Sequence, residues 1–240
     1  MDNFRLLLMC IVLCYFGEKF LTVSKTCWEH PYCMCTAANR TSIYCARVQN
    51  ISDVIDLFKS RSPVSKIHLR GTFTTIPSKA FESISVSVLW LAAPLQSDIP
   101  ADSLLGIQDL EILILNLTVY KAIPKVFCNQ YYTEFESSHG RLVSIETELQ
   151  NMSSAVEIRL NKNQLISISE DAFYGTNNIH RIDLSYNNLI YIHPKTLESL
   201  MFLEAIYLQH NRLQMLDGCF YTLNPVVSLF FLVFFFIFVV

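Results

Sequence analysis

Residues 179–192 spell IHRIDLSYNNLIYI and residues 203–216 spell LEAIYLQHNRLQML, which are two copies of one pattern. In both copies, isoleucine or leucine fills the first, fourth, sixth, eleventh and fourteenth positions, and asparagine fills the ninth. Residues 156–168 nearly fit the same pattern, and the asparagines of the three copies are spaced 24 and 24 residues apart. A fixed period of this length indicates a repeat architecture.

Poorer copies extend the pattern toward the N-terminus, so residues 64–220 hold about seven units. A second ladder, with one large apolar residue per unit, supports the same register. Its members are Phe81, Leu104, Phe127, Leu149, Phe173, Leu197 and Phe220. The alternative, an ordinary α/β protein with leucine-rich strands, does not explain why two ladders share one period.

The Leu-x-Leu segment of each unit predicts a short strand whose leucines point into the core, because side chains alternate along a strand. The asparagine of the following turn can satisfy backbone groups of the neighbouring coil. One unit cannot bury its own apolar face, so the units must stack. The sequence therefore predicts an α/β fold: a right-handed leucine-rich-repeat solenoid, shaped like a horseshoe, with a parallel β-sheet on its concave face.

Four cysteines, Cys27, Cys33, Cys35 and Cys45, are crowded ahead of the repeats. Together with the repeats they resemble extracellular leucine-rich-repeat proteins of adhesion and signalling, which carry a cysteine-rich N-terminal cap. That resemblance implies the disulfides Cys27–Cys35 and Cys33–Cys45. The cap and the Ile-Pro-x-x-Ala-Phe style of repeat are also similar to small arthropod proteins related to the non-catalytic subunit of a shrimp luciferase. The alternative, a zinc site, would favour wider cysteine pairs and a second pair.

The two ends of the chain differ from the repeats. Residues 1–24 predict a signal peptide, because an apolar run too short to span a bilayer follows Arg5; the alternative is an uncleaved signal anchor. Residues 25–63 then form the cysteine-rich cap and residues 64–220 the repeats. The apolar tail at 225–240 leaves three alternatives: a lipid-anchor signal, a transmembrane segment that would attach the protein to the membrane, or a translated intron.

Four N-glycosylation sequons begin at Asn39, Asn50, Asn116 and Asn151. Sequons, a signal peptide and clustered cysteines together indicate an oxidising compartment. We therefore expect an extracellular protein that is either secreted or attached to the cell surface.

The sequence carries no motif for nucleophilic, metal-dependent or phosphate-binding catalysis, and its six histidines are scattered without metal-ligand spacing. Its formal net charge of −3 provides no basic field for nucleic acid. We expect no enzymatic activity, no metal and no cofactor. The expected function is to bind a protein or peptide ligand in adhesion, signalling or recognition. The alternative is a non-catalytic scaffold subunit of a secreted enzyme complex.

The outward positions of most predicted strands are polar, but those of the second and third units are not. Val88, Trp90, Ile112 and Ile114 would lie side by side on the concave face, between a basic and an acidic strand. An apolar patch rimmed by charge marks a partner site, and tryptophan is enriched at interface hot spots. We predict that these four residues form the binding patch. The alternative places them in the core, in a shifted register.

Overall fold

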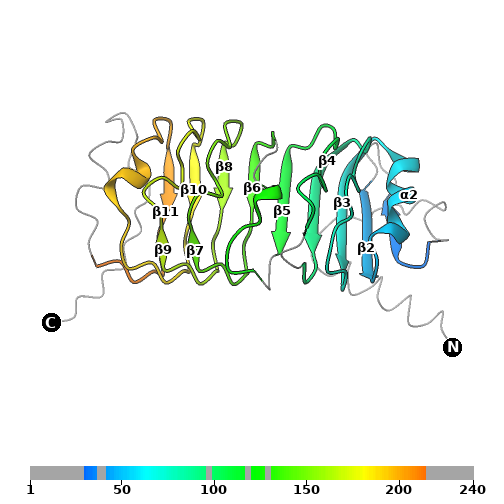
Figure 1. Cartoon of the computed structure of the whole chain (residues 1–240), viewed down its shortest axis with the longest axis horizontal. Helices are drawn as coiled ribbons and strands as arrows, with labels where there is room; N and C mark the ends of the chain where they lie inside the picture. Colours follow the sequence, from blue (N-terminus) through cyan, green and yellow to red (C-terminus); the bar gives the residue numbers. More distant parts are fainter. Residues whose placement is uncertain (1–29, 37–41, 96–98, 117–119, 128–130, 215–240) are drawn as a thin grey trace.

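The computed structural model describes residues 30–36, 42–95, 99–116, 120–127 and 131–214. This part of the chain winds into an elongated arc of stacked coils, with its strands side by side along the arc (Figure 1). The predicted signal peptide, Cys27, Asn39 and the apolar tail at 225–240 lie outside the described residues.

A nine-stranded sheet runs the length of the described arc in the order β1-β2-β3-β4-β5-β6-β8-β10-β11. Its strands are β1 (Cys33–Thr36), β2 (Ser42–Val48), β3 (Val64–Gly71), β4 (Val86–Ala92), β5 (Ile112–Asn116), β6 (Glu134–Glu136), β8 (Glu157–Arg159), β10 (Arg181–Asp183) and β11 (Ala205–Tyr207). Strands β2 to β11 pair in parallel, and β1 pairs antiparallel with β2. Each repeat therefore contributes one strand, and the predicted solenoid is confirmed.

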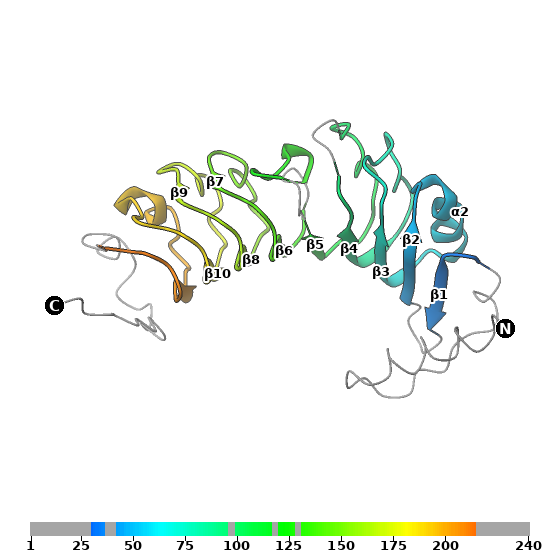
Figure 2. The ribbon, with the colours of Figure 1, turned by 90° about the horizontal axis from the view of Figure 1, so that it is seen from below.

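The sheet lies on the inner side of the arc (Figure 2). Short elements return the chain from one strand to the next: α2 (Ser52–Arg61), η2 (Lys125–Phe127), β7 (Ser144–Ile145), β9 (Ser167–Ile168) and η3 (Pro194–Leu197). Strands β7 and β9 pair with each other on the outer side. Within the described chain α2 is the one α-helix, so most of the outer side is irregular coil.

Both ladders of the repeat pattern are buried in a single apolar core. The described members of the second ladder, Phe81 to Leu197, are 0 to 1% exposed. The leucines of the strands, such as Leu89 and Leu113, are equally buried and lie opposite one another in adjacent coils. The core is therefore a stack of equivalent layers, one for each coil.

The asparagines of the repeat pattern bridge neighbouring coils; they are Asn163, Asn187 and Asn211. The Nδ2 group of Asn187 donates to the carbonyl of Leu184 in its own coil, at 2.9 Å, and to that of Leu160 in the preceding coil, at 3.0 Å. Its Oδ1 accepts the N–H of Leu165 at 3.1 Å. The other two asparagines make the same kinds of bonds. These side chains thus satisfy buried backbone groups where the chain turns.

The cap extends the sheet at its N-terminal end. A disulfide joins Cys33 of β1 to Cys45 of β2, as the resemblance implies, and Cys35 is also disulfide-bonded. Helix α2 covers the end of the core with Val54 and Phe58, both 0% exposed. The cap therefore closes the first coil and shields its apolar side chains from water.

The middle repeat, which contains β6, is the most irregular one. Ser137 occupies the position that a leucine fills in the neighbouring coils. Its N–H donates to the carbonyl of Arg159, just as the N–H of Leu160 donates to the carbonyl of Asp183. Two large side chains of the same coil, Tyr132 and Phe135, are each 1% exposed and their rings stack 5.8 Å apart. These rings fill the core beside a small serine, so the coil keeps the stacking register.

No helix among the described residues is both long enough and apolar enough to cross a membrane.

Candidate binding surface

The four residues of the predicted patch lie on adjacent strands of the concave sheet. Val88 of β4 is opposite Ile112 of β5, and Trp90 is opposite Ile114. All four side chains are partly exposed, whereas the residues that alternate with them, such as Leu91, are 0 to 1% exposed. The patch therefore belongs to the solvent side of the sheet and not to the core.

Aromatic rings extend this patch toward the N-terminal end. The imidazole of His68 on β3 meets the indole of Trp90 edge to face, with 5.1 Å between ring centroids. On its other side the same imidazole stacks on Tyr44 of β2 at 4.5 Å. The parallel pairing of β2, β3 and β4 places these three residues in one row across the sheet.

The repeat pattern does not predict that Tyr44 belongs to this face, because β2 lies in the cap, ahead of the first recognisable repeat. Its signal is the alternation in residues 43–45, where Ile43 and Cys45 occupy the buried positions opposite Ile67 and Leu69. The cap therefore supplies a strand to the same face as the repeats.

A basic strand borders the patch on this side. Lys66 and Arg70 are exposed on the outward positions of β3, where they pair with Val88 and Ala92 of β4. Neither cation has an ion-pair or side-chain hydrogen-bond partner among the described residues. Both charges are therefore available to a ligand.

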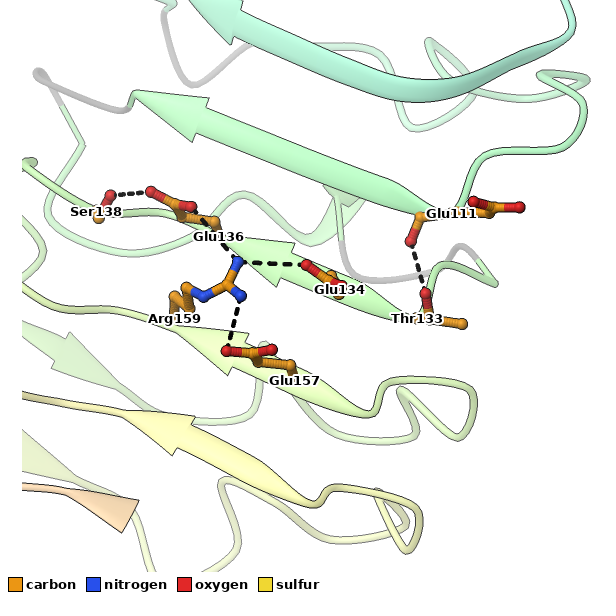
Figure 3. Close-up of polar contacts among 7 residues, drawn as sticks. All are labelled: Glu111, Thr133, Glu134, Glu136, Ser138, Glu157 and Arg159. Carbon is orange, nitrogen blue, oxygen red and sulfur yellow. Dashed lines mark hydrogen bonds and ion pairs between the residues drawn. The ribbon is translucent and has the colours of Figure 1, made fainter. Parts of the chain in front are cut away.

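An acidic cluster borders the patch on the opposite side (Figure 3). Glu134 and Glu136 of β6 lie beside Ile112 and Ile114, and the Arg159 guanidinium of β8 points between them. Arg159 contacts Glu134 at 3.3 Å, Glu136 at 3.9 Å and Glu157 at 2.8 Å. Three carboxylates thus face one cation, and the cluster keeps an excess of negative charge.

Serine hydroxyls hold two of the concave-face carboxylates in place. Ser138, 6% exposed, donates a hydrogen bond from its Oγ to Glu136, and Ser185, 2% exposed, donates to Asp183 at 2.6 Å. These bonds restrict the carboxylate rotamers, so the charges have defined positions before any ligand arrives.

The described residues contain no group of three or more histidine, cysteine, aspartate or glutamate side chains that could hold a metal ion. The concave face instead combines aromatic, aliphatic and charged side chains on a rigid sheet. Such a surface can bury apolar groups and pair charges, which is the chemistry of recognition.

The leucine-rich-repeat family model matches residues 153–213, which hold β8, β10, β11 and the three bridging asparagines. The stacked coils of the described residues have the leucine-rich-repeat fold. A search of curated protein sequences finds no match to this chain. The predicted relationship to the shrimp luciferase subunit therefore stays a prediction.

Two solved structures similar to this chain are of the Toll–Spätzle complex of Drosophila. One chain is 19% identical, with a TM-score of 0.44, and the match covers 65% of this chain and 26% of that one. A chain of the glycosylated form is 12% identical, with a TM-score of 0.48, and the match covers 82% and 34% of the two chains. This chain thus spans about a quarter to a third of the chains that it matches.

The described sequons lie at different places on the leucine-rich-repeat arc. Asn50 and Asn151 are exposed in the turns after β2 and before β8. Asn116 is partly exposed at the end of β5, opposite Ala92, and its Oδ1 is buried without a hydrogen-bond partner among the described residues. A glycan on Asn116 would therefore stand beside the patch, whereas the other two would not.

Proposed function

We propose that this leucine-rich-repeat protein binds a protein or peptide ligand outside the cell, through its concave face and with Trp90 at the centre of the contact. The observation that carries the proposal is the partly exposed apolar patch on β4 and β5, bordered by charged strands. Burial of apolar surface is worth about 25 cal/mol per Å². A ligand that covers Trp90 would therefore gain free energy at the point where the sheet is most apolar.

The extracellular location rests on three features. The Cys33–Cys45 disulfide is of a kind that forms and persists in oxidising compartments. Residues 1–24 have the composition of a signal peptide, and four sequons follow. We propose that the protein enters the secretory pathway and is glycosylated at Asn39, Asn50, Asn116 and Asn151.

The proposal contains no catalytic step. The carboxylates of the concave face are engaged by Arg159 and by the hydroxyls of Ser138 and Ser185. The protein then acts by holding a partner, in adhesion, signalling or recognition.

The test compares the wild-type chain with Trp90→Ala and with Tyr174→Ala. Tyr174 is 66% exposed in a turn outside the nine-stranded sheet, so its variant removes an exposed aromatic ring from a different surface. Each tagged protein, secreted from cultured cells, is crosslinked in the extracellular fluid of its source tissue, and the captured partner is identified and then titrated. Truncation of a hot-spot aromatic costs about 2 kcal/mol or more, or about 30-fold in affinity.

We expect this loss for Trp90→Ala and wild-type binding for Tyr174→Ala. A partner that binds wild type and Trp90→Ala equally would show that the concave patch is not the binding site. A partner that is an enzyme at fixed stoichiometry would favour a scaffold subunit over a recognition protein.

A further inference from the structure

Charge is ordered across the strands of the concave face, from basic on β3 through apolar on β4 and β5 to acidic on β6. We infer that the ligand is an extended peptide segment that crosses these strands, with an acidic side chain over β3, an apolar one over β4 and β5, and a basic one over β6. This inference rests on the proposed function, since it specifies which ligand the same surface accepts.

One row of residues shows the order directly. Lys66 pairs with Val88, Val88 with Ile112, and Ile112 with Glu134, so a cation and a carboxylate flank two aliphatic side chains in a line across four strands. Glu157 continues the row on β8. Along any one of the strands β3, β4, β5 and β6 the character of the outward residues changes much less, so a ligand that crosses these strands meets all three kinds of surface.

The basic and the acidic border of the patch differ in how many of their charges already have an ion-pair partner. Lys66 and Arg70 are exposed and lack ion-pair partners among the described residues, so an acidic ligand group would be their first counter-charge. At the other end Arg159 neutralises one of three carboxylates. A basic ligand group would share the carboxylates that remain, much as Arg159 already does.

The spacing fits an extended chain. Adjacent strands lie about 4.8 Å apart, so β3 and β6 are separated by about 14 Å. An extended chain rises about 3.3 Å per residue, and every second side chain faces the same way, so residues i, i+2 and i+4 span about 13 Å. The pattern acidic-x-apolar-x-basic, in either chain direction, therefore places its three anchors over β3, over β4 and β5, and over β6.

Other kinds of partner fit this face less well. A nucleic acid or an anionic polysaccharide would meet like charges at Glu134, Glu136 and Glu157. A flat bilayer would touch the ends of the arc before it reached the patch on the inner side (Figure 2). A peptide segment that carries both charges avoids these conflicts.

The experiment selects short random peptides, displayed on phage, on the immobilised full-length secreted chain at low salt. Three synthetic peptides are then made from the selected consensus: the mixed-charge sequence, a version with two acidic flanks and a version with two basic flanks. Their affinities are measured for wild type, for Trp90→Ala, for Lys66→Glu with Arg70→Glu, and for Lys121→Glu with Arg212→Glu. Lys121 and Arg212 are exposed and lie outside the sheet, so the last variant is a control with the same change in net charge.

On the wild-type protein the mixed peptide should bind about tenfold more tightly than either like-charged peptide. The Lys66→Glu/Arg70→Glu variant should instead prefer the peptide with two basic flanks, while the control variant should behave as wild type. Because Lys66 and Arg70 are exposed, this variant should keep the wild-type far-UV spectrum and unfolding midpoint.

Two other results would contradict the proposed function or the charge-order inference. If the selected peptides bind Trp90→Ala as tightly as wild type, the proposed function fails. If they depend on Trp90 but show no preference among the three charge patterns, the charge order plays no part and this inference alone is overturned.

Discussion

Trp90 and Leu91 are consecutive residues of β4 whose side chains lie on opposite faces of the sheet. Leu91 is 1% exposed in the core, whereas Trp90 is partly exposed and its ring packs against His68 at 5.1 Å. The single step along the strand therefore separates a side chain that stabilises the fold from one that is available to a partner.

Substitutions at these two positions should have unequal effects on stability. Leu91→Ala leaves a cavity in the packed core and should lower the free energy of unfolding by about 2–5 kcal/mol. Trp90→Ala removes a ring from the surface and should lower it by about 1 kcal/mol or less. Urea denaturation followed by circular dichroism measures both. Equal losses would mean that Trp90 belongs to the core and that the proposed patch does not exist.

Asn187→Ala should be strongly destabilising although it removes only a polar side chain. Asn187 is 6% exposed and its bonds satisfy the carbonyls of Leu160 and Leu184 and the N–H of Leu165. Each buried group left without a partner costs about 1–3 kcal/mol, so we expect a loss of about 3 kcal/mol or more in the free energy of unfolding.

Asn188→Ala is the matched control, because this neighbouring side chain is partly exposed and makes no hydrogen bond among the described residues. Its free energy of unfolding should change by less than about 0.5 kcal/mol. If both variants unfold at the same urea concentration, water replaces the hydrogen bonds of Asn187 without loss of stability.

The fold of this chain was predictable where its repeats are regular. Asn163, Asn187 and Asn211 mark coils in which a side chain satisfies the turn, and there the strands are three residues long. After β3 and β4 the equivalent positions hold threonine and proline, Thr72 and Pro94, and these two strands are eight and seven residues long. The 24-residue spacing of the asparagines therefore predicts the turns and short strands of the later coils only.

Parts of the candidate site could not be predicted, for two physical reasons. The row that contains Tyr44 begins in a strand without Leu-x-Leu, because Ile43 and Cys45 fill its core positions. Alternation also predicts that Ser138 and Ser185 point outward, yet both are buried because their hydroxyls bond to carboxylates two residues earlier. Periodicity specifies the face of a strand, but not the hydrogen bonds that short polar side chains make there.

Arg159→Met should destabilise the protein in a salt-dependent way. The substitution keeps an unbranched side chain but removes the cation from Glu134, Glu136 and Glu157, which are 19–33% exposed. The remaining carboxylates repel each other, and we expect a loss of about 1 kcal/mol at low ionic strength. High salt screens this repulsion, so thermal unfolding curves should approach those of wild type near 1 M salt, where the Debye length is about 3 Å.

Arg181→Met serves as the control, because Arg181 is an exposed residue on β10 without an ion pair among the described residues. Its unfolding midpoint should stay close to wild type at every salt concentration. If the difference in unfolding midpoint between Arg159→Met and wild type does not depend on salt, the guanidinium does not balance the charges of Glu134, Glu136 and Glu157.

The folded protein should carry the Cys33–Cys45 disulfide, and removal of this bond should weaken the fold. The bond closes a loop with a sequence separation of 12 residues, and such a constraint on the unfolded chain is worth about 3 kcal/mol. Cys33→Ala with Cys45→Ala avoids an unpaired thiol and should lower the free energy of unfolding by about that amount. Residue 45 also fills a core position opposite Leu69, so a small further loss from packing is expected.

Peptide mapping of the non-reduced protein tests the pairing itself. Trypsin should release residues 26–40 joined to residues 41–47, because the first peptide contains Cys33 and the second contains Cys45. Fragmentation of the joined peptides should assign the bond to Cys33 and leave Cys35 for Cys27, as the resemblance to capped extracellular proteins implies. A free Cys45 thiol in protein collected from the culture medium, or a bond from Cys45 to Cys35, would contradict both the pairing and the geometry of β1 against β2.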